Sequence, residues 1–200
     1  MSRTSLSAVA LTLSLGAISI ATTSLAPTQD MPESAAQHRK LLQAVGQWEG
    51  EMTVFIPGMD AQVSSAKETV RAVGSLWTSA RFECDMMGMP FIGIGILGYD
   101  QEKEKYVGTW VDSMRGTITL MEGTEAEDGT LTMRWEAVNP MTGENEPNWY
   151  DLKYSKREYT STFYSGEGTK GMEVKMKRKN AGKGKAKAKG KAKKKEAADK

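Results

Sequence analysis

The period of the apolar pattern changes at Gly46. Residues 35–45 predict one short helix, because apolar side chains recur there at helical spacing, and Ser34 stands in position to cap it. The apolar face of this helix consists of Leu41, Leu42 and Val45. Beyond Gly46, apolar and polar residues alternate, which is the period of a half-buried β-strand. The chain therefore predicts a leading helix followed by strands.

Strand-like segments continue along most of the remaining chain and are separated by turn sequences such as Pro57-Gly58. The segments that predict strands are residues 48–56, 76–84, 91–99, 106–111, 117–121, 131–135, 149–154, 159–164 and 172–178. Short strands with no helices between them are typical of an all-β barrel or sandwich. We predict an antiparallel up-and-down barrel of nine or ten strands, because closure removes the exposed edges of a sheet.

The five tryptophans fall on five different predicted strands. Large aromatic side chains from many strands fill or line one shared interior. Four of them are candidate liners of a cavity for a small apolar ligand: Trp48, Trp77, Trp110 and Trp135. A barrel of this strand number either encloses a ligand or is filled by its own side chains. The alternative to a ligand-binding barrel is therefore a structural or interaction protein with a filled core.

The N-terminal residues have the features of an export signal. Arg3 supplies the positive charge, an uncharged apolar run follows, and small residues predict cleavage after Ala21, with Ala26 as the alternative. The apolar run is shorter than the ~20 residues that a membrane-spanning helix needs. We expect an exported protein, periplasmic or extracellular, with no transmembrane span in the mature chain. Residues 22–34 are then a linker, and residues 35–179 form the barrel domain.

The net charge of +2 conceals two oppositely charged parts. Residues 177–200 carry 12 Lys and Arg and two Asp and Glu, a net charge of +10, which leaves −8 for residues 1–176. Residues 180–200 consist mainly of Lys, Ala and Gly and predict a disordered tail. Its candidate residues for binding anionic surfaces are Lys183, Lys185, Lys187, Lys189, Lys191, Lys193, Lys194 and Lys195.

Export determines which anionic partners we expect for this tail. Anionic lipid, lipopolysaccharide and acidic polysaccharide are favoured over nucleic acid, because an exported protein is in a different compartment from the chromosome. A polybasic segment binds any of these polyanions through its charge. The alternative is a tail that folds back on the acidic body and neutralises it.

Several local motifs resemble one known family. They are Gly46-Gln47-Trp48, Gly98-Tyr99-Asp100 and Trp110-Val111-Asp112-Ser113. Across residues 35–179 the series resembles the bacterial domain-of-unknown-function 1579 family, whose members are exported, calycin-like (lipocalin-like) barrel proteins. The resemblance implies fold and export, and it carries no established activity. The likeness to lipocalins further implies that Arg178 closes one barrel end over Trp48. Alternatively, Arg178 simply begins the basic tail.

Gly93, Gly95 and Gly98 match the letters of the dinucleotide motif G-x-G-x-x-G. That motif binds phosphate only where a helix begins directly after it. Here a charged turn and another strand follow, so we interpret the segment as a strand whose glycines permit a bend or close approach. We predict no nucleotide and no other cofactor.

Metal and catalytic chemistry have little support in the sequence. The weak metal candidates are Cys84, Met86, Met87 and Met89, a soft set suited to Cu(I), although methionines also fill irregular space. One cysteine and one histidine exclude a Cys-based zinc site and a multi-histidine site, and we expect His38 to be a surface or packing residue. The carboxylates show no defining pair: Asp100, Asp112, Glu122 and Asp151. We assign no catalytic residue and expect a binding protein; an envelope enzyme that uses Asp100 or Asp112 is the less favoured alternative.

Overall fold

The computed structural model describes residues 33–139 and 142–179. The helix and the strands belong to one compact unit that begins at Ser34. The predicted leader, residues 22–32 of the predicted linker, and the predicted tail with its lysines all lie outside the described residues.

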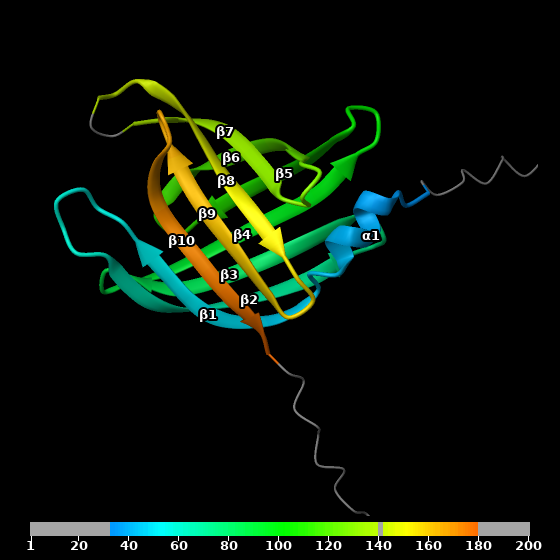
Figure 1. The fold of residues 1–200 in the computed structure, drawn as a ribbon, viewed down its shortest axis with the longest axis horizontal. Helices are drawn as coiled ribbons and strands as arrows, with labels where there is room; N and C mark the ends of the chain where they lie inside the picture. Colours follow the sequence, from blue (N-terminus) through cyan, green and yellow to red (C-terminus); the bar gives the residue numbers. More distant parts are fainter. Residues whose placement is uncertain (1–32, 140–141, 180–200) are drawn as a thin grey trace, which may run out of the picture. The chain divides into compact units, whose positions relative to one another are not determined.

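Ten antiparallel strands form a closed barrel (Figure 1). Each strand pairs with its neighbours in the chain, and the last strand pairs with the first. The elements are α1 (Ala36–Leu42), β1 (Gly46–Val54), β2 (Gln62–Val73), β3 (Trp77–Met86), β4 (Met89–Asp100), β5 (Lys105–Asp112), β6 (Arg115–Glu125), β7 (Leu131–Val138), β8 (Asn145–Tyr154), β9 (Glu158–Ser165) and β10 (Thr169–Arg178). This architecture confirms the predicted up-and-down barrel of nine or ten strands with one short helix.

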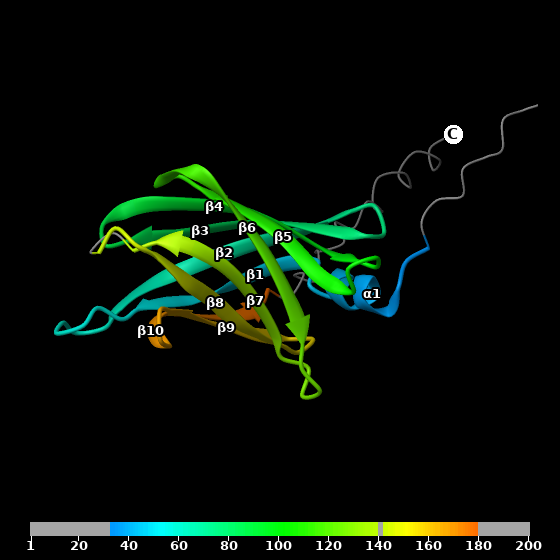
Figure 2. The same cartoon turned by 90° about the horizontal axis from the view of Figure 1, so that it is seen from above.

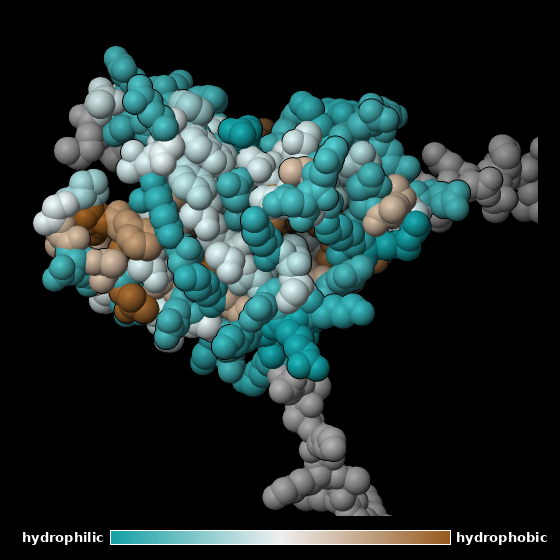
Figure 3. Space-filling view, in the orientation of Figure 1, coloured by the Kyte–Doolittle hydropathy of each residue, from teal (hydrophilic) through white to brown (hydrophobic). Residues whose placement is uncertain are grey.

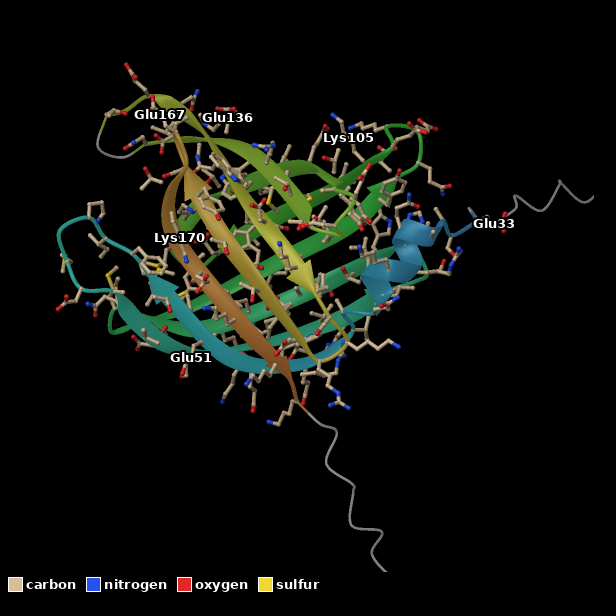
Figure 4. The ribbon with its side chains drawn as sticks, in the orientation of Figure 1. Glu33, Glu51, Lys105, Glu136, Glu167 and Lys170 are labelled. Atoms are coloured by element: carbon tan, nitrogen blue, oxygen red, sulfur yellow. The ribbon has the colours of Figure 1, made fainter. Side chains whose placement is uncertain are left out.

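The two-residue period along each strand separates the interior from the outer surface. Inward positions carry the core, and the largest fully buried side chains are Trp48, Met52, Met133 and Met176. Many outward positions carry charge, and the side chains of Glu51, Lys105 and Glu136 are exposed on the outside of the barrel (Figure 4), whereas β4 and β6 also expose apolar side chains such as Ile94 and Leu120. The barrel is therefore held together by apolar side chains from all around its wall.

The helix α1 lies at one end of the barrel, which we call the closed end (Figures 1 and 2). His38 is buried and fastens the helix to β4. Its Nδ1 accepts a hydrogen bond from the backbone N–H of Ala35 at 2.9 Å, and its Nε2 lies 2.9 Å from the carbonyl oxygen of Tyr99. Because a carbonyl only accepts, Nε2 carries the proton. His38 is thus a packing residue that anchors the helix.

Two details of the predicted helix were wrong. The residue at the N-cap is Ala35 rather than Ser34, because the His38 ring performs the capping role from within the helix. The helix ends at Leu42, its buried residues are His38 and Leu41, and Val45 is 37% exposed. The chain turns out of the helix before Val45, so the helical period no longer places that side chain.

One strand was not predicted at all. The inward positions of β2 are Ser64, Ala66, Glu68 and Val70, of which only two are apolar, and Val63 on the outward face is 61% exposed. This segment therefore lacks the alternation that marks a half-buried strand. Its pairing with β1 along nine positions and with β3 along eight holds it in the barrel wall.

Candidate functional site

The interior of the barrel contains a cavity of about 490 Å³. Its lining is predominantly apolar and aromatic and comes from strands all around the wall, with Leu41 of α1 and Ala44 just after it at the closed end. The aromatic liners include Phe82, Phe91, Trp110, Trp135, Tyr150 and Phe163. A cavity of this size and character lies within the range of small-molecule sites, which is roughly 300–1,000 Å³.

Arg178 lies over Trp48 at the closed end of the barrel. Its guanidinium carbon lies 4.1 Å from the centre of the Trp48 ring, where the likeness to lipocalins places it. Its nitrogens donate hydrogen bonds to three backbone carbonyls, those of Gln43 (2.6 Å), Val45 (2.7 Å) and Lys156 (2.9 Å). Trp48 in turn donates from Nε1 to the carbonyl of Ala44 at 2.9 Å. Arg178 therefore joins the last strand to the end of the helix and to the β8–β9 turn.

The opposite end of the barrel, which we call the mouth, has an apolar rim. Figure 3 shows apolar surface gathered where the β1–β2 loop lies. Exposed apolar side chains at this end are Met59 (63%), Val63 (61%), Met87 (58%) and Met89 (48%). Monomeric proteins seldom expose clusters of large apolar side chains without a functional reason.

The shortest strand pairing in the barrel wall is that between β6 and β7. These strands pair only where Glu122–Glu125 meets Leu131–Arg134. Towards the mouth they separate, although β6 continues back to Arg115 and β7 continues on to Val138. Thr119 and Trp135 stand on either side of this gap and both line the cavity. Fewer backbone hydrogen bonds therefore close the cavity on this side.

The structure divides the four predicted tryptophan liners. Trp110 and Trp135 line the cavity, and Trp48 lies buried at the closed end beneath Arg178. The prediction for Trp77 was wrong. Its inward neighbour on β3 is the buried Thr78, so period two directs Trp77 to the outer surface, where it is 36% exposed.

The glycines of β4 make room for two of these rings. A Cβ atom on Gly93 would lie 2.0 Å from Cζ2 of Trp110 inside the barrel, and one on Gly98 would lie 2.2 Å from Cε3 of Trp77 outside it. Both distances are far shorter than any van der Waals contact, so larger residues would displace the rings. The strand continues through Gly98 to Asp100 with no helix after it. The close-approach interpretation of these glycines is therefore confirmed, and a phosphate-binding turn is absent from this segment.

The carboxylates singled out in the sequence form structural contacts. Asp112 accepts hydrogen bonds from Trp110 Nε1 (3.2 Å) and Arg115 (3.0 Å) near the mouth. Asp100 accepts from the backbone N–H of Lys103 (3.1 Å) in the turn at the other end of β5. Glu122 pairs with lysines on the outer surface, and Asp151 accepts from Thr132 at 2.7 Å. Asp100 and Asp112 are thus separated by the length of a strand.

The soft cluster lies on the β3–β4 hairpin near the mouth. The Cys84 thiol contacts the Met52 sulfur at 3.7 Å, Met86 lines the cavity, and Met87 and Met89 are exposed. Burial raises the pKa of the Cys84 thiol, which disfavours the thiolate that soft metals bind. Among residues 33–139 and 142–179, no three His, Cys, Asp or Glu side chains are grouped to hold a metal ion.

The sequence interpretation missed Glu68, the most unusual polar residue of the cavity lining. The Tyr159 hydroxyl donates to its Oε2 at 2.6 Å. Burial raises the pKa of the Glu68 carboxyl to about 7, and the Tyr159 hydrogen bond opposes this shift. Burial and the charge of Glu68 also raise the pKa of Tyr150. The available signal was a glutamate between Ala66 and Val70 at period two, in a segment flanked by predicted strands.

A closed antiparallel β-barrel with an apolar internal cavity defines the class of this protein. The family described as "Protein of unknown function (DUF1579)" matches residues 33–180, and the chain belongs to this family. The comparison with curated proteins found no match. The described part of the chain contains no helix with the length and apolarity to cross a membrane.

One solved structure with a similar fold is the S-type phycobiliprotein lyase CPES from Guillardia theta. The two chains are 11% identical with a TM-score of 0.51, and the alignment covers 71% of this chain and 91% of that chain. At this identity the likeness concerns the fold alone.

Proposed function

We propose that this protein is an exported, non-enzymatic barrel that binds a small apolar ligand in its interior, with a basic tail that attaches it to anionic surfaces. The observation that carries the proposal is the cavity of about 490 Å³ with its apolar and aromatic lining. A filled core, the alternative, would leave no such space. A barrel fold shared with a phycobiliprotein lyase is compatible with a small ligand.

The lining supports this function through the way its polar groups are used. Asp112 and Arg115 pair with each other, and the Thr78 hydroxyl donates to the carbonyl of Leu97 at 3.3 Å. Their polar groups are therefore already engaged within the protein wall. A ligand in the cavity contacts mainly rings and aliphatic groups, so burial of its apolar surface supplies most of the binding free energy.

We expect the neutral apolar probe N-phenyl-1-naphthylamine to bind inside the barrel with one-to-one stoichiometry. Its fluorescence should rise on binding and the tryptophan emission should fall, because Trp110 and Trp135 line the cavity. Substitution Ala80→Trp should weaken this binding by about tenfold or more, since a large ring then occupies the cavity. Fluorescence titration of the mature protein measures both effects.

The matched control is Ser79→Trp, which adds the same ring to the outward-facing neighbour on β3. It should leave the probe affinity unchanged. Equal loss in both variants, each checked for folding by its thermal midpoint, would contradict binding within the cavity. If the unmodified protein did not bind the probe, the alternative of a structural or interaction protein with a filled core would be favoured.

The tail is expected to bind vesicles that contain phosphatidylglycerol. Each lysine near an anionic surface is worth about 1 kcal/mol, and salt screens the attraction. Raising the salt from about 50 to 200 mM should therefore release the mature protein in a co-sedimentation assay. A variant that ends at Lys179 should bind neither these vesicles nor neutral ones. Salt-independent binding, or full binding by the shortened variant, would refute an electrostatic role for the tail.

A further inference from the structure

One charged group of the cavity has no cationic partner in the described structure. The charged residues of the lining are Glu68, Asp112 and Arg115, and the last two form an ion pair at 3.0 Å. No basic side chain within residues 33–139 and 142–179 forms an ion pair with Glu68. The lining therefore presents one unneutralised acidic group to an otherwise apolar space.

The contacts of Glu68 leave it capacity for a ligand. A carboxylate accepts about four hydrogen bonds, and the Tyr159 hydroxyl supplies one at 2.6 Å to Oε2. This bond holds the carboxyl group in place against β9. A buried carboxylate is costly unless it is paired or hydrogen-bonded. A donor on the ligand, and above all a charged donor, would offset part of that cost.

The aromatic rings around Glu68 favour a positive charge as well. Tyr159 lies between Trp48 and Tyr154, with ring centres 5.1 Å and 5.5 Å away. Tyr150 and Tyr154 both line the cavity, and the charge of Glu68 contributes to raising the pKa of both hydroxyls. The faces of such rings carry partial negative charge and attract cations. Arg178 is engaged with the Trp48 ring and three backbone carbonyls.

We propose that the ligand of the cavity is an apolar amine, whose protonated nitrogen binds the Glu68 carboxylate among the rings of Tyr150, Tyr154 and Tyr159. This inference rests on the proposed function, which assigns an apolar ligand to the cavity, and adds the chemical class of that ligand. The same carboxylate repels an anion, so fatty carboxylates are disfavoured although their chains would fit. Specificity then comes from one charge placed in an apolar lining.

The test compares three probes with the same chain: octylamine, octanol and octanoate. Each competes with N-phenyl-1-naphthylamine for the mature protein at pH 8, where Glu68 is largely ionised and octylamine is protonated. We expect octylamine to displace the dye at a concentration about tenfold lower than octanol does, because a charge-assisted hydrogen bond and ring contacts are added. Octanoate should be the weakest competitor.

The variant Glu68→Gln keeps the shape of the side chain and removes its charge. It should still bind the dye, and octylamine and octanol should then compete equally. Glu122→Gln, which removes a carboxylate from the outer surface, should retain the preference for the amine. A second readout needs no variant, because lowering the pH from 8 to 5 protonates Glu68 and should abolish the preference. Burial and the charge of Glu68 raise the pKa values of Tyr150, Tyr154 and Tyr159, so these hydroxyls stay protonated over this range.

The outcomes separate the two proposals. Equal competition by octylamine and octanol in the unmodified protein would overturn the amine inference and leave the apolar ligand in place. A preference that survives in Glu68→Gln and at pH 5 would also overturn it. Failure of the unmodified protein to bind the dye or any of the three competitors would instead overturn the proposed function.

Discussion

Replacing Arg178 with alanine is expected to lower the thermal midpoint by about 10 °C. The substitution removes three charge-assisted hydrogen bonds and the stacking on Trp48, together worth about 3–4 kcal/mol. A domain of this size loses roughly 3 °C for each kcal/mol. The loss is large because Arg178 joins β10, α1 and the β8–β9 turn. Thermal unfolding followed by circular dichroism measures it.

Arg178→Lys tests how the guanidinium acts. A lysine keeps the charge, but it cannot donate in three fixed directions while lying flat on a ring. The thermal midpoint of Arg178→Lys should therefore fall between those of the unmodified protein and Arg178→Ala. The matched control is Arg71→Ala, an exposed arginine on β2, whose effect should stay within about 0.5 kcal/mol. An unchanged midpoint for Arg178→Ala would show that this residue merely begins the tail.

Glu68→Gln is expected to stabilise the protein at pH 8. The pKa of Glu68 is raised from 4.5 to about 7 in the folded state, so between these values the folded state binds more protons than the unfolded state. Stability therefore declines as the pH rises through this window and stays lower above it. Glutamine avoids this loss of stability, which is about 3 kcal/mol, and can still accept the hydrogen bond of Tyr159.

Urea unfolding of both proteins between pH 4.5 and pH 8 measures this effect. The two should differ little at pH 4.5 and most at pH 8. The lysines beside Glu122 and Glu173 lower the pKa values of these two carboxyl groups and move their contributions to more acidic solution. Glu122→Gln serves as the control and should not be stabilised at pH 8. If the free energy of unfolding of Glu68→Gln changed with pH in parallel with that of the unmodified protein, Glu68 could not be a buried carboxylate without a cationic partner.

The barrel was predictable wherever inward positions are apolar. Residues 48–56 and 76–84 show the pattern clearly, because their inward side chains must leave water while most of their outward ones meet it. The strand β2 shows where this reasoning fails. Its inward positions include Ser64 and Glu68, and hydrogen bonding to β1 and β3 compensates for the missing apolar signal. The one strand that the pattern missed is the strand that carries the most unusual residue of the cavity.

The site was predictable only in part. Three of the four chosen tryptophans are inside the barrel, but Trp77 packs over Gly98 on its outer surface. The size of a tryptophan side chain indicates that it packs against other groups. It does not indicate on which face of the sheet the side chain lies. The contact between Glu68 and Tyr159 joins residues 91 positions apart, so no local pattern contains it. Sequence spacing also could not show that Asp112 is engaged by Arg115 and Trp110.

The sequence by itself determined the all-β barrel and its leading helix, because local alternation of polar and apolar residues records which side of each strand meets water. It also determined the separation of an acidic body from a basic tail, since charge is additive along the chain. Only the tertiary structure decided that the barrel contains a cavity, that Arg178 lies over Trp48 at one end, and that Glu68 lines the cavity. These properties depend on distances between strands far apart in the chain, and closure of the barrel sets those distances.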